Sequence, residues 1–527
     1  MRQNKRKILG LFFSTVCCFV GASLPLYAQS SQANPLSAID WLTKNTPQTG
    51  VVQPVAQPAP TISEPPIARS GSIPEVTVAP LGAATQRRLG LLPFSVTGLP
   101  AQMWTGSDAA SLSFALRNAT SQRIPAAQEL ILMLMLAEAD DLRPEAAGLT
   151  WLEARVDALM ELGAIEPALS LVQQADPIRS KSLFSRWLTL ALLAKQEAAP
   201  CAALVETPRL APDETFRIYC TARNGDFDTA SLLFGTAAAL DLLPSSKETL
   251  LARFLDPDLF EDEAMPRAPV RPDALTFRLF EAAGEPLSTA PLPRAFAHAD
   301  LSEDAGWKAQ LEAAERLARA GVLPSNKLLG LYSDRDAAAS GGIWDRVDAL
   351  QDFEAALQDA DPGKVSNALP AMWRGMQAAR LEVVFSDLFA QDLAKLTLDG
   401  PAANIAHRME LLSRSYETAP LPVTPDKRAR YLASVAIGEP DANLADTEMA
   451  NSVANAFGPQ SVPSPGLREM EPTNVGAALL QVLKLLADAG RGDLSALQTA
   501  LTDLRALGLE DMARRVALQM LILKDRG

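Results

Sequence analysis

The sequence predicts an all-α fold, a right-handed superhelix of stacked helical hairpins (an α-solenoid). Beyond residue 90, apolar residues recur three or four positions apart, as in Trp344, Val347, Leu350, Phe353 and Leu357. This spacing gives a helix one apolar face. Convincing alternation of apolar and polar residues, which is typical of strands, is absent. Short glycine-containing turns separate the expected helices.

The first 28 residues have the order of a secretory signal. Four basic residues precede Ile8, an apolar run extends to about Leu26, and the small residue Ala28 ends the segment. A basic start, an apolar stretch and a small residue at the cut are what export requires. We therefore expect residues 1–28 to be removed and the mature protein to reach the periplasm of a Gram-negative bacterium. An uncleaved inner-membrane anchor is the alternative. Later apolar runs are too short to span a membrane.

The charge of the chain restricts its partners. The formal net charge is -14, and loss of the four basic signal residues takes it to about -18. Binding to nucleic acid or to an anionic membrane surface depends on Lys and Arg neutralising phosphates. We therefore expect envelope proteins as partners, with peptidoglycan contact as a further option, and no nucleic acid.

Residues 29–90 are rich in Pro, Ser, Thr, Gln, Ala and Val, and such a composition cannot bury enough apolar area to fold alone. We interpret this region as a disordered tether. Within it, residues 35–44 form a candidate helical motif with apolar side chains near helical spacing: Leu36, Ile39, Trp41 and Leu42. Short motifs of this kind dock into grooves of partner proteins. The alternative is a patch that packs back on the parent domain.

A glycine-aspartate turn separates two expected helices at residues 222–237, which read ARNGDFDTASLLFGTA. This stretch resembles the second half of a tetratricopeptide repeat at Gly225, Asp226, Phe227, Ala230 and Phe234. Weaker copies of the turn or of its small packing residues occur at Gly163, Ala168, Gly492 and Gly508. The resemblance covers about a fifth of the chain and implies stacked helical hairpins.

Two proline-rich interruptions suggest module boundaries, because long loops are usually functional or separate modules. The prediction is an N-terminal helical-repeat region at 91–264, a proline-rich connection at 265–300 and a central helical region at 301–418. A proline-rich loop with short helices follows at 419–473, and helical hairpins occupy 474–527.

The residues offer little material for catalysis. Only two histidines occur, His298 and His407, so a catalytic triad or a histidine-rich metal site is disfavoured. Phosphate-loop and dinucleotide motifs are absent. We predict that the protein is not an enzyme and has no cofactor or metal. The acidic stretch at 256–263 is interpreted as a solvated helix end, with calcium binding as the alternative.

Carboxylates are plentiful, so a glycosidase is a separate case. The chain is similar to peptidoglycan lytic transglycosylases in expected compartment and helix content. It lacks their catalytic Glu-Ser pair and the Gly-Leu-Met-Gln run that follows. A peptidoglycan-binding relative of these proteins is the alternative to our main hypothesis, a protein-protein interaction scaffold in the cell envelope.

Two cysteines lie beyond the signal, Cys201 and Cys220. In an oxidising compartment they are expected to form a structural disulfide, with two buried free thiols as the alternative. Two Trp-Arg pairs are candidates to line a binding groove: Trp344 with Arg346, and Trp373 with Arg374. The alternative is that the tryptophans fill the core.

Overall fold

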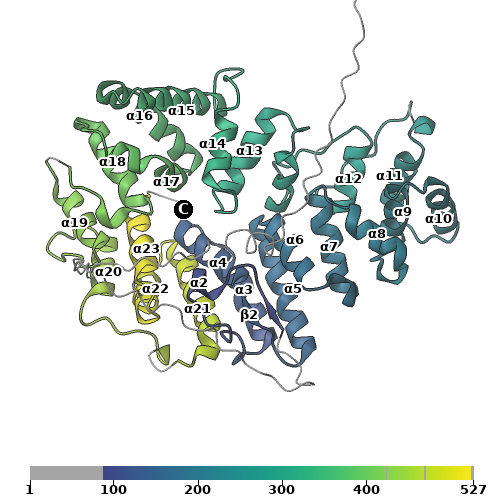
Figure 1. Cartoon of the computed structure of the whole chain (residues 1–527), viewed down its shortest axis with the longest axis horizontal. Helices are drawn as coiled ribbons and strands as arrows, with labels where there is room; N and C mark the ends of the chain where they lie inside the picture. The colour runs from purple at the N-terminus through teal and green to yellow at the C-terminus, as the bar shows by residue number, and fades with distance from the viewer. Residues whose placement is uncertain (1–86, 261, 423, 468–469, 524–527) are drawn as a thin grey trace, which may run out of the picture. The chain divides into compact units, whose positions relative to one another are not determined.

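The computed structural model describes residues 87–260, 262–422, 424–467 and 470–523. These residues are mostly helical (Figure 1), and the all-α prediction is confirmed. Two short strands, β1 (Arg88–Leu89) and β2 (Ala139–Asp140), pair antiparallel. The predicted docking motif at residues 35–44 lies outside the described residues.

The helices of the N-terminal half pack mainly against their neighbours in sequence. In chain order they are α2 (Phe94–Thr97), α3 (Ala109–Ala119), α4 (Pro125–Leu136), α5 (Glu145–Leu162), α6 (Ile165–Gln174), α7 (Lys181–Leu193), α8 (Ala198–Glu206), α9 (Glu214–Arg223), α10 (Phe227–Ala239) and α11 (Ser245–Leu255). Short 3-10 helices lie between some of them: η1 (Pro177–Arg179), η2 (Pro208–Leu210) and η3 (Pro257–Phe260).

Further helices follow with the same hairpin-like packing. They are α12 (Ala274–Ala282), the 3-10 helix η4 (Arg294–Leu301), α13 (Trp307–Ala318), α14 (Ser325–Tyr332), α15 (Ile343–Gln358), α16 (Pro362–Ala379), α17 (Glu382–Leu393) and α18 (Gly400–Leu412). The last group is η5 (Tyr416–Thr418), α19 (Lys427–Ala436), α20 (Glu448–Phe457), η7 (Pro472–Asn474), α21 (Val475–Ala489), α22 (Leu494–Ala506) and α23 (Glu510–Ile522).

Aspartate begins many of these helices. At the N-cap its carboxylate accepts hydrogen bonds from backbone N–H groups that have no partner inside the helix. This holds for α3, α9, α10, α12, α16, α19 and α22, whose N-caps are Asp108, Asp213, Asp226, Asp273, Asp361, Asp426 and Asp493. Local sequence therefore determines where many helices begin.

The glycine-aspartate turn at residues 222–237 connects α9 to α10. Gly225 has φ +92°, a left-handed conformation that glycine adopts without a steric cost. Asp226 then caps α10 by accepting a hydrogen bond from the Thr229 N–H at 3.0 Å. Ala230 is buried, Phe234 is half-buried and Phe227 is exposed. Gly163, Gly492 and Gly508 also lie in turns with positive φ, and Ala168 is buried in α6.

A disulfide joins Cys201 in α8 to Cys220 in α9. Both cysteines are fully buried. The bond therefore links two consecutive helices from inside the core, next to the α9–α10 turn.

Part of the proline-rich segment 265–300 is packed into the helical array. It contains α12 and most of η4, and the rings of Phe277 and Phe296 meet at a centroid distance of 5.2 Å. Helix α12 contacts α7 and α11. Residues 267–271, by contrast, are exposed.

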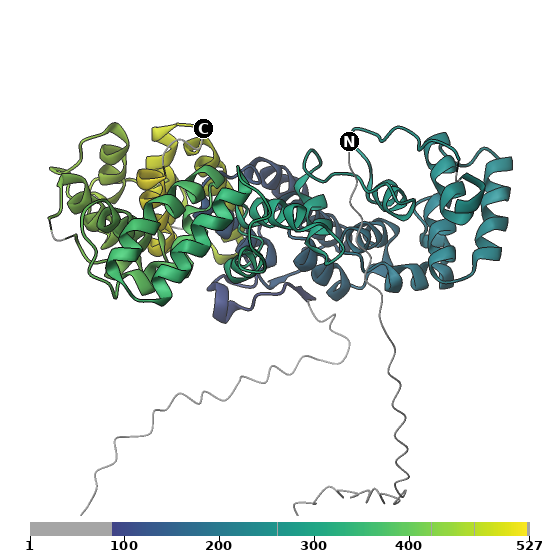
Figure 2. The same ribbon diagram turned by 90° about the horizontal axis from the view of Figure 1, so that it is seen from above.

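The two ends of the described chain pack against each other. Helix α21 contacts α3 and α4, and α23 contacts α4; the yellow C-terminal helices lie beside the purple and blue N-terminal ones in Figure 1 and Figure 2. The Gln122 side chain donates to the Leu483 carbonyl at 2.7 Å, and Gln519 Oε1 accepts from the Ala126 N–H at 2.8 Å. A simple solenoid has contacts only between neighbouring repeats, so these long-range contacts add a constraint that stacking does not supply.

Gly476 in α21 marks the closest approach in this interface. Its N–H donates to the Met103 carbonyl at 3.0 Å. A Cβ atom at this position would lie 2.3 Å from the Trp104 ring, and Trp104 is fully buried. Only a residue without a side chain fits here, because a dense core cannot yield by that amount.

We predict that Gly476→Ala lowers the free energy of unfolding by about 1–3 kcal/mol, since it overpacks this contact. The matched control is Gly235→Ala in α10, where nothing lies within 4 Å of the added Cβ. That change should stabilise the helix by about 0.5–1 kcal/mol. Urea unfolding measures both. Equal effects of the two substitutions would contradict the packing described for Trp104.

Candidate functional site

Of the four residues predicted to line a groove, only Arg374 is fully exposed. Trp344 packs against Trp307 with ring centroids 5.1 Å apart. Trp373 is only 4% exposed, so it belongs to the core, whereas the next residue, Arg374, is exposed. Trp373 therefore cannot serve as an accessible anchor. The sequence pattern did not distinguish the inner from the outer face of α16.

Arg346 has a structural partner. Its Nε and Nη2 atoms donate to the two carboxylate oxygens of Glu315 at 2.8 and 2.9 Å. The Tyr332 hydroxyl donates to the same carboxylate at 2.5 Å. Because Glu315 and Tyr332 are buried, this network satisfies polar groups inside the fold. Arg346 is therefore not available to a ligand in this arrangement.

The two histidines lie apart from each other. His298 Nε2 is 3.5 Å from Glu166 Oε1, and His407 Nδ1 is 2.9 Å from the Pro420 carbonyl. Burial lowers the pKa of both imidazoles. Within the described ranges, no three His, Cys, Asp or Glu residues are arranged to hold a metal ion.

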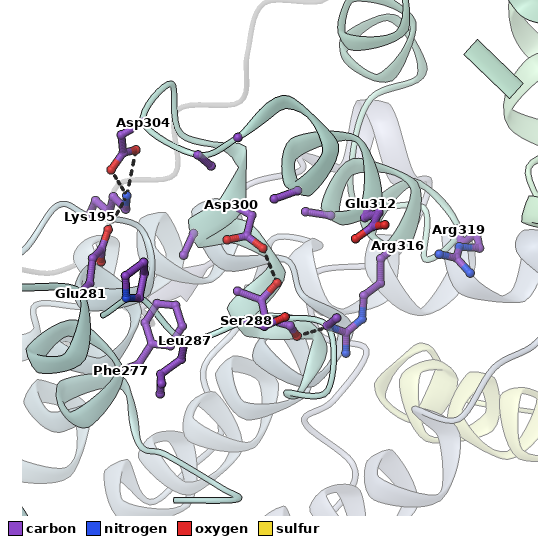
Figure 3. Close-up of a pocket in the computed structure, with 18 residues that line it drawn as sticks. Lys195, Phe277, Glu281, Leu287, Ser288, Asp300, Asp304, Glu312, Arg316 and Arg319 are labelled. Carbon is purple, nitrogen blue, oxygen red and sulfur yellow. Dashed lines mark hydrogen bonds and ion pairs between the residues drawn. The ribbon is translucent and has the colours of Figure 1, made fainter. Parts of the chain in front are cut away.

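A cavity of about 780 Å³ lies between α7, α12, η4 and α13 (Figure 3). Its lining includes polar and charged side chains from the turn after α7, from α12, from the loop before η4, and from η4 and α13: Lys195, Glu281, Thr289, Asp300, Glu312 and Arg316. In Figure 3, Lys195, Glu281 and Asp304 gather at one end, Glu312 and Arg316 lie at the other, and Asp300 stands between them.

Lys195 organises the first end of this cavity. Its Nζ lies 2.7 Å from Glu281 Oε1 and 2.7 Å from Asp304 Oδ2. It also donates to Ser302 Oγ at 2.9 Å. Burial lowers the pKa of Lys195, but the hydrogen bonds to Asp304 and Glu281 outweigh this effect and raise it. The hydrogen bond from Lys195 lowers the pKa of Asp304 to about 2.

This ion pair is one part of a longer chain of alternating charges. Arg278 pairs with Glu281 and lies 3.3 Å from Glu197, which in turn is 2.8 Å from Arg223. The chain connects α9, the start of α8, α12 and the end of α7 to the loop that carries Asp304. Since every charge has an opposite neighbour, this end of the cavity serves as a scaffold rather than as a source of unpaired charge.

The other end is held by hydrogen bonds to the loop before η4. Arg316 donates to the Thr289 carbonyl at 3.0 Å and to the Leu292 carbonyl. The Thr289 hydroxyl donates to Asp300. Burial raises the pKa of Asp300, and the neighbouring Glu281 and Glu312 carboxylates add to that rise. A carboxyl with a raised pKa beside a second carboxylate can donate and accept protons.

The sequence contained one signal for this cavity. The proline-rich interruption at 265–300 was expected to be functional or to mark a boundary, and its loop and η4 form the cavity wall. Lys195, Asp300 and Arg316 were not predicted as site residues. They are brought together by contacts between segments about 100 residues apart, which local patterns do not encode.

A second feature is the exposed apolar surface of α10, which contacts α9 and α11 (Figure 1). Of its thirteen residues only Ala230 and Ala237 are buried. Four large apolar side chains on or just after the helix face solvent: Phe227 (47% exposed), Leu232 (71%), Leu240 (63%) and Leu242 (54%). We call these four residues the α10 surface.

Comparisons with protein-family models, with curated proteins and with solved structures find no match to this chain. In the part of the chain that the structure describes, no helix combines the length and the apolar character that crossing a membrane requires.

One buried carboxyl has an unusual environment. Glu410 in α18 is 8% exposed, and its carboxylate has no hydrogen-bond partner among the described residues. Burial raises the pKa of Glu410 to about 7. The folded state therefore holds a proton that the unfolded chain loses near pH 4.5.

From this shift the stability should fall as pH rises from about 4.5 to 7, because the folded state binds the proton more tightly in that window. We predict that Glu410→Gln raises the free energy of unfolding above pH 7 by on the order of 2 kcal/mol, and that the difference shrinks towards pH 4. The control is Glu439→Gln, since Glu439 is exposed and forms no ion pair within the described residues. A constant effect of Glu410→Gln at every pH would contradict the assignment.

Proposed function

We propose that this protein is an exported helical-repeat scaffold of the bacterial cell envelope that binds a partner protein through the α10 surface. The observation that carries the proposal is the exposure of four large apolar side chains on α10 and in the turn that follows it. Contiguous exposed apolar patches usually mark sites of interaction.

The composition of α10 strengthens this reasoning. Apolar residues lie on nearly all sides of the helix, as is usual for helices buried in a core. Its packing against α9 and α11 buries two alanines and only partly covers Leu233 and Phe234. Leaving leucines such as Leu232 and Leu240 in water forgoes about 1.5–3 kcal/mol each relative to burial. A partner that covers them would recover part of that free energy.

The surroundings of the α10 surface indicate the chemistry of the partner. Asp226, Asp228 and Asp241 border it and are exposed, and the whole chain has a formal net charge of -14. An apolar helix flanked by Lys or Arg fits both properties. We therefore propose a basic, amphipathic helix of an envelope protein as the occupant.

Two N-terminal segments provide export and tethering in this proposed role. Residues 1–28 supply a secretory signal, and the segment from residue 29 to the start of β1 at Arg88 supplies a tether, on the sequence patterns described above. The motif of Leu36, Ile39, Trp41 and Leu42 would provide a separate attachment to an envelope protein. The partial tetratricopeptide resemblance agrees with this role, because such repeats present surfaces to proteins.

Binding of peptidoglycan strands is a second candidate. It is favoured by Asp300 and Glu312, which both line the cavity of about 780 Å³. Sugar rings usually stack on aromatic faces, and Phe277 is the one aromatic residue in that lining. The scaffold proposal therefore has the stronger support.

The test places a photo-crosslinking residue at position 232 in living cells, with position 270 as the matched control because Val270 is 89% exposed and lies outside the α10 surface. We predict a defined crosslink from position 232 alone, to a segment that is apolar with Lys or Arg at its flanks. A synthetic peptide of that segment should bind Leu232→Asp about tenfold more weakly than the wild type. Folding should be preserved, since the side chain is exposed.

Equal crosslinking from both positions, or equal peptide binding by both proteins, would refute the α10 surface as the docking site. Recovery of glycan fragments would favour the second candidate. The double variant Ile39→Asp, Trp41→Ala, tested alongside, reports separately on the tether motif. The mass of the purified protein reports whether the mature chain begins at Gln29.

A further inference from the structure

A second cavity, of about 310 Å³, lies where α4, the α13–α14 turn, α17 and α23 meet. Four arginines line it, together with two carboxylates: Arg319, Arg380, Arg414, Arg515, Glu129 and Asp387. The excess of positive charge is notable in a chain whose formal net charge is -14. We call it the arginine cavity.

Two of these arginines are balanced by the two carboxylates. Arg515 pairs with Glu129. Arg414 lies 3.8 Å from both Glu129 and Asp387, and its backbone N–H donates to Asp387 at 3.0 Å. Both acidic side chains of the lining are therefore already engaged.

The other two arginines have no carboxylate partner in the lining. Arg319 donates through Nε to the Glu315 carbonyl of its own helix at 3.1 Å. The Arg380 side chain makes no hydrogen bond or ion pair with the described residues. Burial lowers the pKa of Arg319, and the positive charges of Arg346 and Arg380 lower it further, against the opposing effect of Glu315. An anion between Arg319 and Arg380 would remove this repulsion.

The backbone at Arg380 adds an independent observation. This residue ends α16 with φ +57°, a left-handed conformation in which helices usually place glycine. Arginine carries a steric cost at such a position. Glycine would therefore fit this turn without a steric cost, so the backbone does not require arginine here.

Gln128 indicates which anion fits. It lines the arginine cavity, is 8% exposed, and its Oε1 has no hydrogen-bond partner in the described structure. Buried acceptors are normally satisfied. A singly protonated phosphate, the form of a monoester below its second pKa of about 6, offers a P–OH donor beside its charged oxygens, whereas a fully ionised dicarboxylate offers none.

We propose that the arginine cavity binds a phosphate group, free or as a monoester, with Arg319 and Arg380 contacting its oxygens and Gln128 accepting from its hydroxyl. Guanidinium groups match phosphate oxygens in geometry and charge. This site is separate from the α10 surface and does not depend on the proposed function.

The test is calorimetric titration of the full-length chain with inorganic phosphate, glycerol phosphate and malonate at constant ionic strength and a pH of about 6, where the phosphates keep a proton. We expect both phosphates to bind and malonate to bind far more weakly. Tighter binding of glycerol phosphate than of inorganic phosphate would assign the site to a monoester, and the reverse would assign it to free phosphate.

Arg380→Gln should weaken phosphate binding about tenfold or more. Its matched control is Arg374→Gln, because Arg374 and Arg380 are both exposed and Arg374 lies in the helix that Arg380 ends but outside the cavity lining. Arg380→Gly is a second variant that suits the left-handed backbone, so it should fold with unchanged or higher thermal stability and still lose binding.

Three results would overturn the proposal. They are absence of phosphate binding by the wild type, equal affinities of the Arg380 and Arg374 variants, and malonate binding as tight as phosphate binding.

Discussion

The packing of Trp104 on Gly476 is the contact on which the rest of this structure depends. Helix α21 buries residues on several sides, so one neighbour cannot cover it. Helix α22 covers one side, and α3 and α4 cover another. The absence of a side chain at Gly476 lets the indole and the helix backbone meet, and the Gly476 N–H to Met103 carbonyl bond fixes their register. Sequence neighbours alone would leave this apolar surface in water, which is unfavourable.

The same contact explains where charged residues gather. Because α4 and α23 are held together, Glu129 and Arg515 meet across almost the whole chain, and both face the α13–α14 turn in the arginine cavity. Arg319 lines this cavity and also the larger one beside α12. The larger cavity has a compensated end, built on Lys195, whereas the arginine cavity has two cations without carboxylate partners. That difference in charge balance separates a structural network from a candidate ligand site.

Local patterns in the sequence predict much of the fold. Apolar spacing predicts the helices, and the turn at Gly225 with the cap at Asp226 forms where the residues indicate. With only two cysteines beyond the expected signal, Cys201 and Cys220 were the expected pair, and the structure joins them.

Local patterns do not specify which helix covers which apolar face. For that reason Trp344 and Trp373 were predicted as groove residues, although Trp373 is buried and Trp344 packs against Trp307. The pairing of Trp104 with Gly476 was not predicted for the same reason. The cavity residues were not predicted for the same reason, because Lys195 and Asp304 come together only through tertiary packing.

The most direct test of this account is hydrogen-deuterium exchange of the full-length chain, comparing wild type with Trp104→Ala. The contact between the two ends predicts that amides of α3, α4, α21 and α23 lose protection together, while α8 and α9, which the disulfide joins and which are distant in sequence, keep theirs. If only the amides next to residue 104 respond and α21 and α23 stay protected, the two ends are stable separately and the central role of this interface is contradicted.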